Sequence, residues 1–378
     1  MTTTYKCPSC GAAMEFDSST QKMKCPQCGN QIDVSEFGNM DAQDADNSGG
    51  QNGEQAAQGG ERTYDESSEF AGQDFGGGKF EGDGTDGTMN MKVYHCQSCG
   101  AELLSDEYTS AVICSFCGNP SLVEDRLTGA YKPKKIIPFK INREQAKGIY
   151  KKWAKKGKLT PSALKSQSTI EKISGLYVPF WLYDYRAETQ MTASAQKIRT
   201  TRSGDTEYTY RDHFHVYRDA EADFQMLPAD ASEKMDDSAM DKMEPYMYEE
   251  LEPFAPAYLQ GYLSERYSLT HQDMEQRVNR RVDKYITEMT RDTIVGYSTV
   301  SILSNRIRRD NYNVQYVLLP VWVLNCRYQG KDFQFMLNGQ TGKIVADRPI
   351  SKLRALAWGA GIFAVSLIIT MLGGLLIL

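Results

Sequence analysis

Residues 5–12 read YKCPSCGA and residues 94–101 read YHCQSCGA, so six of eight letters recur at an offset of 89. A second Cys-x-x-Cys-Gly unit follows each copy at the same offset, and 14 residues separate the two units in both copies. Four thiolates in two short loops joined by a hairpin-length spacer suit a tetrahedral zinc ion. We therefore expect two small zinc ribbons, at residues 1–38 and 91–128, each with one structural Zn²⁺. The predicted ligands are Cys7, Cys10, Cys25 and Cys28, and Cys96, Cys99, Cys114 and Cys117.

A glycine follows the second cysteine of every unit. Glycine adopts positive φ without steric cost, so the chain can turn where backbone N–H groups must point at sulfur. Apolar residues between the units can form the strands of a hairpin. These residues are Met14, Phe16 and Met23 in the first ribbon, and Leu103, Leu104, Tyr108 and Val112 in the second.

Two alternatives to zinc remain at this point. A disulfide framework would suit a secreted chain, but the first ten residues contain no apolar core of a signal peptide. A mononuclear iron site with four cysteine ligands has the same softness and geometry. A catalytic zinc would keep an open position, which two closed four-cysteine sets do not offer, although His95 beside Cys96 could perturb the second site.

The segment between the ribbons has a different composition. Residues 41–90 contain twelve Asp and Glu residues against two basic residues, and the remainder is rich in Gly, Gln, Asn and Ser. Such a segment has too little apolar surface to offset the entropy cost of ordering it. We therefore expect residues 39–90 to be a disordered acidic linker, with the first ribbon tethered rather than packed.

A basic amphipathic helix is predicted over residues 142–157. Asn142 suits the N-cap position, Gln145 can bond back to it, and Gly157 ends the pattern. An apolar stripe at helical spacing comprises Ala146, Ile149, Tyr150 and Trp153, and the other faces carry Lys147, Lys151, Lys152, Lys155 and Lys156. The lysine face could be solvated, or could bind anionic lipid headgroups or nucleic-acid phosphate.

Residues 129–354 are predicted to form an α+β domain. Passages near Pro179 and Pro320 each place proline before an aromatic-containing apolar run at the head of a long β segment. Residues 210–224 suggest another strand, paired across a turn near Gly204. Residues 258–290 have the composition of a helix, and residues 338–343 that of a hairpin turn. The likeness of the two strand passages is consistent with an internal duplication.

The end of the sequence predicts the cellular location of the protein. Residues 355–378 are 24 consecutive uncharged residues, which span about 36 Å as a helix, more than the roughly 30 Å hydrocarbon core. Lys343, Arg348, Lys352 and Arg354 precede them, so the positive-inside rule places residues 1–354 in the cytoplasm. We expect a tail-anchored, single-pass cell-membrane protein, and a reducing cytoplasm agrees with thiolate ligands.

The sequence gives little support for an enzyme. None of the four histidines, His95, His213, His215 and His271, lies in a recognisable catalytic motif. Two of them, His213 and His215, would share one face of a strand, where they could bind a metal or be ordinary strand residues. Cys326 lies in an apolar run, where a free thiol usually behaves as a small buried hydrophobe. We predict no catalytic residues.

Nucleic-acid binding is disfavoured by charge. Residues 1–38 carry three basic against four acidic residues, and residues 91–128 carry two against five. A zinc ion with four thiolates adds two negative charges to each ribbon. A ribbon that tracks phosphates should be basic, so protein partners are the better expectation.

Several phrases together resemble the membrane-associated TFIIB-type zinc-ribbon proteins of Gram-positive bacteria. They are the CPSCG and CPQCG knuckles, IPFK (residues 137–140), YVPFWLYDY (177–185), FAPAYLQGYLSERY (254–267) and the terminal apolar helix. The resemblance implies an assembly role at the inner face of the membrane, with links to phage-shock and flotillin-like membrane-stress systems. The duplicated ribbon and the long linker depart from a single-ribbon pattern.

The predicted function is therefore a non-enzymatic, tail-anchored cytoplasmic scaffold whose ribbons recruit proteins to the bilayer. The alternative is a membrane-tethered nucleic-acid-binding regulator of transcription or replication. Homo-oligomers and hetero-oligomers are both compatible with the sequence.

Overall fold

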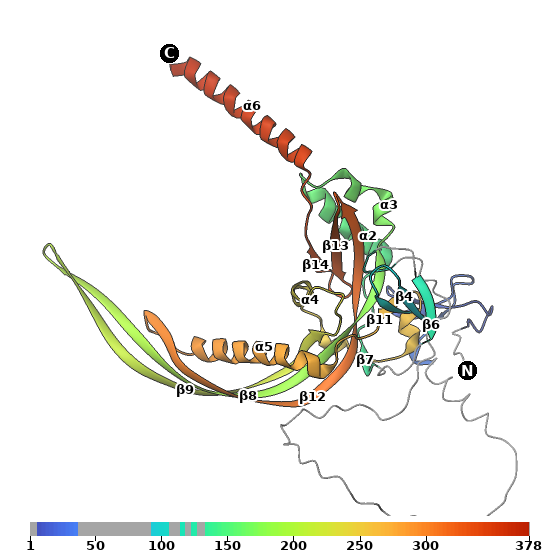
Figure 1. Ribbon diagram of the computed structural model, residues 1–378, viewed down its shortest axis with the longest axis horizontal. Helices are drawn as coiled ribbons and strands as arrows, with labels where there is room; N and C mark the ends of the chain where they lie inside the picture. Colours follow the sequence, from blue (N-terminus) through green and yellow to red (C-terminus); the bar gives the residue numbers. More distant parts are fainter. Residues whose placement is uncertain (1–5, 37–91, 106–113, 118–121, 127–132, 378) are drawn as a thin grey trace, which may run out of the picture.

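The computed structural model describes residues 6–36, 92–105, 114–117, 122–126 and 133–377 (Figure 1). The linker predicted over residues 39–90 lies outside these ranges. So do Tyr108 and Val112 of the predicted second hairpin, and Gly118.

Two long antiparallel strands run through the centre of the fold. β8 (Ser174–Ser203) and β12 (Thr299–Tyr328) each have 30 residues and pair over most of their length. β9 (Thr206–Asp230) returns along β8 after a turn in which Gly204 has a φ of 62°. The predicted strands and the predicted turn are therefore confirmed, but neither proline begins its strand, because β8 starts at Ser174 and β12 at Thr299.

The remaining strands extend the sheet or form the first ribbon. The main sheet has eleven strands in the order β10-β7-β12-β8-β11-β5-β4-β6, with β9 on β8, β13 on β12, and β14 on β13. Its other members are β4 (Lys92–Cys96), β5 (Glu102–Ser105), β6 (Leu122–Arg126), β7 (Lys135–Ile136), β10 (Glu252–Pro253), β11 (Leu263–Glu265), β13 (Lys331–Asn338) and β14 (Ile344–Ala346). A separate three-stranded sheet consists of β1 (Glu15–Asp17), β2 (Lys22–Lys24) and β3 (Gln31–Ile32).

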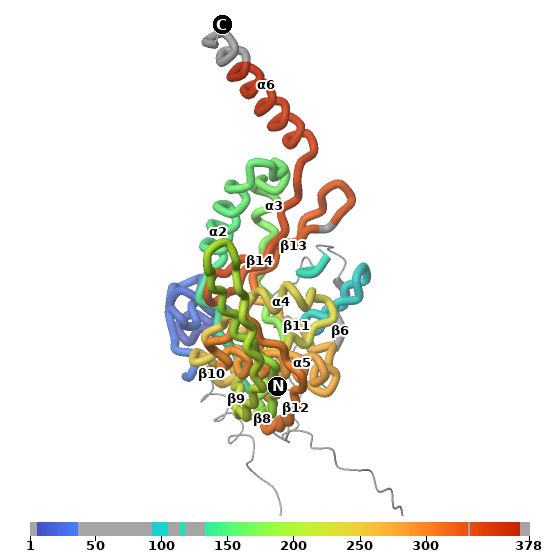
Figure 2. Tube along the Cα trace, turned by 90° about the vertical axis from the view of Figure 1, so that its left-hand side faces the viewer, coloured from blue at the N-terminus to red at the C-terminus, as the bar shows by residue number. Residues whose placement is uncertain are grey.

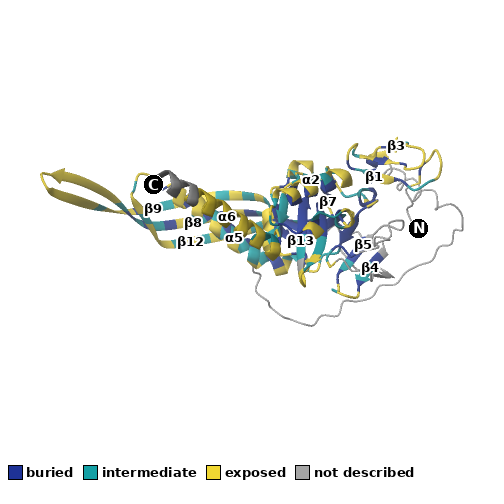
Figure 3. Ribbon diagram, turned by 90° about the horizontal axis from the view of Figure 1, so that it is seen from above, coloured by how far each residue is buried: buried dark blue, intermediate teal, exposed yellow. Residues whose placement is uncertain are grey.

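The outer halves of β8, β9 and β12 form a curved arm that reaches away from the body (Figure 1). Helix α5 (His271–Asp292) lies along one face of the arm and buries Met274, Val278, Val282 and Ile286, which are four residues apart. Odd-numbered β8 residues from Ala187 to Ala195 are buried, and the even-numbered residues between them are exposed or half-buried. This alternation is the period of a strand with one covered face. Figure 3 shows the arm ending in an exposed hairpin tip.

One arrangement of strand, helix and hairpin occurs twice. β7 runs parallel to β12 with Ile136 opposite Leu318, and β11 runs parallel to β8 with Ser264 opposite Tyr177. Helix α2 (Arg143–Lys156) follows β7 and α5 follows β11, and each helix begins eight positions after the first residue of its strand. The hairpin β8–β9 also corresponds to the hairpin β12–β13. An internal duplication of one unit would produce this correspondence.

Matching tryptophans join the two units. The Trp181 indole N–H donates to the Leu269 carbonyl, and the Trp322 indole N–H donates to the Ile141 carbonyl, both at 2.9 Å. Each carbonyl belongs to the residue just before a helix N-cap. Each tryptophan therefore fixes the start of the helix in the other unit.

Removing either indole donor should destabilise the body. Trp181→Phe and Trp322→Phe each leave a carbonyl without its donor, and we expect each to lower the free energy of unfolding by about 1–3 kcal/mol. Urea unfolding of the full-length protein in detergent, followed by circular dichroism, measures the change. An unaltered urea midpoint of unfolding in both variants would contradict a stabilising role for these two hydrogen bonds.

The predicted basic helix is confirmed as α2. The Asn142 side chain accepts from the Gln145 N–H, the Gln145 side chain accepts from the Asn142 N–H, and Gly157 is the C-cap. Trp153 packs on Phe335 of β13, with ring centroids 5.2 Å apart. Lys147 does not belong to the exposed lysine face that was predicted. It is buried, and its ammonium lies 2.8 Å from Glu144 and 2.6 Å from Glu171.

The helix predicted over residues 258–290 is wrong in its first part. α5 begins only after Thr270, whose side chain accepts from the Asp273 N–H. The preceding residues form the 3₁₀ turn η3 (Pro256–Leu259) and then strand β11. β11 exists because β8 and β5 supply its backbone partners, and both are distant in sequence. The shorter helical segments are η1 (Ser162–Lys165), α3 (Gln167–Ile170), α4 (Asp237–Met243) and η2 (Tyr248–Glu250).

The last helix contacts the body near its first residues and then projects away from it (Figure 1). α6 (Lys352–Ile377) is long and apolar enough to cross a membrane, and its candidate span, Lys352–Thr370, has a mean hydropathy of 1.7 and no buried residues. Figures 1 and 2 show it projecting beyond the loop between α2 and α3.

Candidate metal centres

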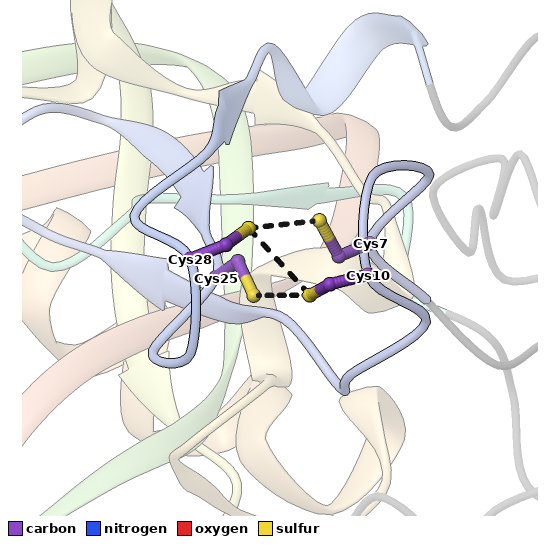
Figure 4. Close-up of side chains that lie close together, drawn as sticks. All are labelled: Cys7, Cys10, Cys25 and Cys28. Carbon is purple, nitrogen blue, oxygen red and sulfur yellow. Dashed lines mark hydrogen bonds between the residues drawn. The ribbon is translucent and has the colours of Figure 1, made fainter.

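The four cysteines of the first ribbon converge on one point (Figure 4). The Sγ atom of Cys10 lies 3.5 Å from those of Cys25 and Cys28, and the Sγ atoms of Cys7 and Cys28 are also 3.5 Å apart. A tetrahedral ion with metal–sulfur distances of about 2.3 Å requires sulfur–sulfur distances of about 3.8 Å. The cluster is therefore close to the size that a bound ion requires.

The second ribbon repeats this arrangement. The Sγ atoms of Cys96 and Cys117 are 3.6 Å apart, and those of Cys99 and Cys114 are 3.7 Å apart. Within each cluster all four sulfurs lie within 4.8 Å of one another, so each cluster could hold a metal ion. These separations are far longer than a disulfide bond of about 2.05 Å, and all nine cysteines are free.

The knuckle loops have a common backbone. The N–H of the first cysteine bonds to a carbonyl just beyond the loop, in Cys7 to Ala12, Cys25 to Asn30 and Cys96 to Ala101, at 2.8–2.9 Å. The glycine that closes each of these three loops has positive φ: 73° at Gly11, 75° at Gly29 and 68° at Gly100. The predicted role of these three glycines is confirmed.

The loops also set the acidity of the thiols. Burial raises the pKa of Cys7, but N–H groups of the knuckle that follows it lower that pKa to about 6. Cys96 lies in the matching position, and its pKa falls to about 7 for the same reasons. The backbone of Ala12 lowers the pKa of Cys10, yet the neighbouring thiols raise it to about 12. Binding a cation therefore requires proton release, because the ligand is the thiolate.

The first ribbon is docked on the body, which corrects the expectation that it is only tethered. The Phe16 N–H donates to the Gln260 carbonyl at 3.3 Å, and the Gln21 side-chain amide donates to the Phe139 carbonyl at 2.8 Å. The Phe16 ring meets Tyr258 edge-on, with centroids 5.2 Å apart. Composition predicted the linker, but it carried no information on whether these surfaces match.

Weakening the contact between the first ribbon and the body should detach the ribbon without releasing its metal ion. Tyr258→Ala removes the ring contact, and we expect it to reduce the docking free energy by about 0.5–1.5 kcal/mol. Hydrogen exchange at residues 15–17 should rise while metal content is unchanged. Gln31→Ala, at an exposed site on the ribbon, is the control. Unchanged hydrogen exchange at these residues in the Tyr258 variant would argue against packing of the first ribbon on the body.

The second ribbon is part of the main sheet. Its strand β5 pairs antiparallel with β11, with Leu104 opposite Ser264. The body also holds both knuckle loops: the Lys234 ammonium donates to the Cys99 carbonyl at 2.8 Å, and the Asn325 side chain donates to the Ser115 carbonyl. The position of this cluster is therefore set by strands and side chains from outside the ribbon.

The two ribbons complete different hydrophobic cores. Met14 and Met23 of the first ribbon share a buried cluster with Trp181, whereas Leu103 of the second shares one with Phe180. Phe180 and Trp181 are neighbours on β8 and so point to opposite faces of the sheet. Each ribbon thus belongs to the core on one face. The docking residues were not predicted from the sequence, where the aromatic content of residues 254–267 was the available signal.

The other candidate residues lie apart from both clusters. His95 points toward Glu102, with 3.6 Å between its Nδ1 and a carboxylate oxygen. His213 and His215 share an exposed face of β9, and neither joins a metal-ligand group among the described residues. Cys326 is half-buried on β12, and its thiol lies 3.4 Å from the Phe333 carbonyl.

No family model and no solved structure matches this chain. The chain is 36% identical over 335 residues to a protein of Bacillus subtilis (strain 168) described as "Uncharacterized protein YdjG". The match covers 74% of this chain and 98% of the relative. Nearly the whole relative is therefore represented here.

Proposed function

This chain belongs to the family of the Bacillus subtilis protein YdjG, and we propose that it is a non-enzymatic scaffold anchored to the cytoplasmic face of the cell membrane. Its two ribbons each hold one structural zinc ion and present binding surfaces for proteins. The resemblance to TFIIB-type zinc-ribbon proteins suggests that these partners act in a membrane-stress response.

One observation carries the proposal. Two four-cysteine clusters are fixed to a single sheet domain, and that domain continues into an unburied apolar helix. Four thiolates fill the coordination sphere of a tetrahedral ion, which is the arrangement of a structural site rather than a catalytic one. A rigid body with two such sites at a membrane is suited to holding other proteins in place.

The membrane assignment rests on α6 and its flank. Arg348 precedes α6, and Lys352 and Arg354 lie in its first turn, ahead of the uncharged residues 355–378. Cations on that side favour a cytoplasmic location for the body. A cytoplasmic body keeps its thiols reduced and available to zinc.

The arm offers a surface for a protein partner. Tyr208 and Tyr210 are about half exposed, at 49% and 51%, and they alternate along β9, so they share one face of the hairpin tip. Exposed tyrosines supply large contact area at low entropic cost and are enriched in protein interfaces. The hairpin tip is thus the proposed binding site for a recruited protein.

Crosslinking in native membranes tests the scaffold function. Proteins crosslinked to the full-length chain should remain after nuclease treatment and should be lost in Tyr208→Ser/Tyr210→Ser. Thr209→Ala, on the opposite face of the same strand, is the matched control and should retain them. Partners that depend on nucleic acid would instead favour the membrane-tethered nucleic-acid-binding regulator.

A further inference from the structure

The end of α2 is fastened to the start of α6. The Ser351 N–H donates to the Leu159 carbonyl at 2.9 Å, and the Arg354 guanidinium donates to the Thr160 carbonyl. The Lys158 ammonium lies 4.8 Å from the centre of the Trp358 ring. The loop after α2 is therefore held at the level where α6 leaves the body (Figure 2).

Cations gather at this junction. Segments 155–160 and 347–354 contain one acidic residue, Asp347. We name their six basic residues the basic collar: Lys155, Lys156, Lys158, Arg348, Lys352 and Arg354. All six are exposed except Arg354, which is half-buried. Within the part of the chain that the structure describes, none of them forms an ion pair.

Lys147, on the same helix, differs from the collar because carboxylates neutralise its charge. It lies nearer the start of α2, where Glu144 and Glu171 neutralise it at 2.8 and 2.6 Å. Among the residues that the structure describes, no carboxylate forms an ion pair with the collar. The Arg348 guanidinium stacks over the Trp153 ring, at 5.0 Å from its centre. The charge of the collar is thus free to meet an external anion.

Apolar side chains identify the kind of anion. Leu353 and Leu356 are 78% and 72% exposed, and Ile350 and Trp358 are exposed as well. Exposed leucines at the start of a candidate span belong in hydrocarbon, and tryptophan favours the interface between hydrocarbon and water. Because Lys158 contacts Trp358, its ammonium lies at headgroup depth when α6 is inserted. Duplex nucleic acid offers phosphate but no apolar phase for these leucines.

We infer that the basic collar binds the headgroups of anionic phospholipids, which fixes the body on the bilayer surface beside its anchor. This inference rests on the proposed membrane anchoring by α6. The collar and α6 form one continuous surface, with the cations at headgroup level and the leucines in the acyl chains. Two attachments, one apolar and one ionic, would hold the ribbons and the arm in a defined orientation to the membrane.

Spin-labelled lipids in bilayers containing the full-length protein test the inference. The fraction of motionally restricted label, compared between phosphatidylglycerol and phosphatidylcholine, gives the lipid selectivity. We expect phosphatidylglycerol to be favoured by about five-fold or more, the effect of one engaged cation. Selectivity should fall as salt rises from 0.1 to 1 M, where the screening length shrinks from about 10 to about 3 Å.

Two matched variants identify the residues. Lys155→Gln/Lys156→Gln/Lys158→Gln/Lys352→Gln should lose the selectivity while keeping both cysteine clusters metallated. Lys22→Gln/Lys197→Gln/Lys242→Gln/Lys284→Gln removes the same charge elsewhere and should keep the selectivity. Equal selectivity in the two variants, or none in the parent protein, overturns the inference. So does binding of a DNA duplex that the collar variant alone loses, if lipid selectivity is absent.

Carbonate washing separates this inference from the proposed function. If the parent protein resists the wash but shows no lipid selectivity, the collar inference fails and the anchor stands. If the parent protein is released by carbonate, the anchor fails and the inference fails with it.

Discussion

Replacing Cys114 by serine should open the second ribbon and the adjoining edge of the main sheet. The variant loses one of the four proposed zinc ligands, and a structural zinc ion typically contributes about 10–16 kcal/mol of folding free energy. Cys114 is buried in the same cluster as Leu103 and Leu263, from β5 and β11. Hydrogen exchange at residues 102–105 and 263–265 should therefore rise strongly, and one metal equivalent should be lost.

Two further cysteine variants give the comparison. Cys25→Ser should release the metal of the first ribbon and leave β5 and β11 protected. Cys326→Ser, outside both clusters, should change neither metal content nor exchange at these strands. If Cys114→Ser left β11 as protected as in the parent protein, the second ribbon would not be supporting the sheet.

Deleting residues 355–378 should release the protein completely from carbonate-washed membranes. The deletion removes all but the first turn of α6, the helix long and apolar enough to span a bilayer. A span of about 20 apolar residues is the length that the hydrocarbon core requires. After carbonate washing, the full-length chain should sediment with membranes and the shortened chain should remain in the supernatant with both metal ions.

Replacing residues 355–378 by an unrelated apolar span is the control, and it should restore sedimentation. A shortened chain that still resisted carbonate would contradict anchoring by α6. Weak, salt-sensitive retention of the shortened chain before the wash would be the expected effect of the basic collar alone.

Local features of the fold could be predicted because their causes are local. The glycine after each second cysteine predicts positive φ, and Gly11, Gly29 and Gly100 adopt it. Asn142 and Gln145 predict the start of α2, and their side chains form the expected capping box. The cysteine spacing predicted which four sulfurs would meet in each ribbon, because a hairpin brings two nearby loops together.

Features with distant causes could not be predicted. Residues 263–265 lie in a run with the composition of a helix, but they form a strand because β8 and β5 lie on either side. Lys147 is buried beside Glu171, which follows α3 and approaches it from a distant part of the sequence. The first ribbon packs on the body through the contact of Phe16 with Tyr258. Amino-acid composition does not predict whether two such surfaces fit together. The arm likewise follows from the long pairing of β8 with both β12 and β9.

Metal analysis of the full-length protein, purified anaerobically from native membranes, tests the central claim most directly. The account predicts two zinc ions per chain, released with proton uptake on acidification because the ligands are thiolates. One zinc ion per chain, or iron in place of zinc, would contradict the claim that each cysteine cluster is a structural zinc site.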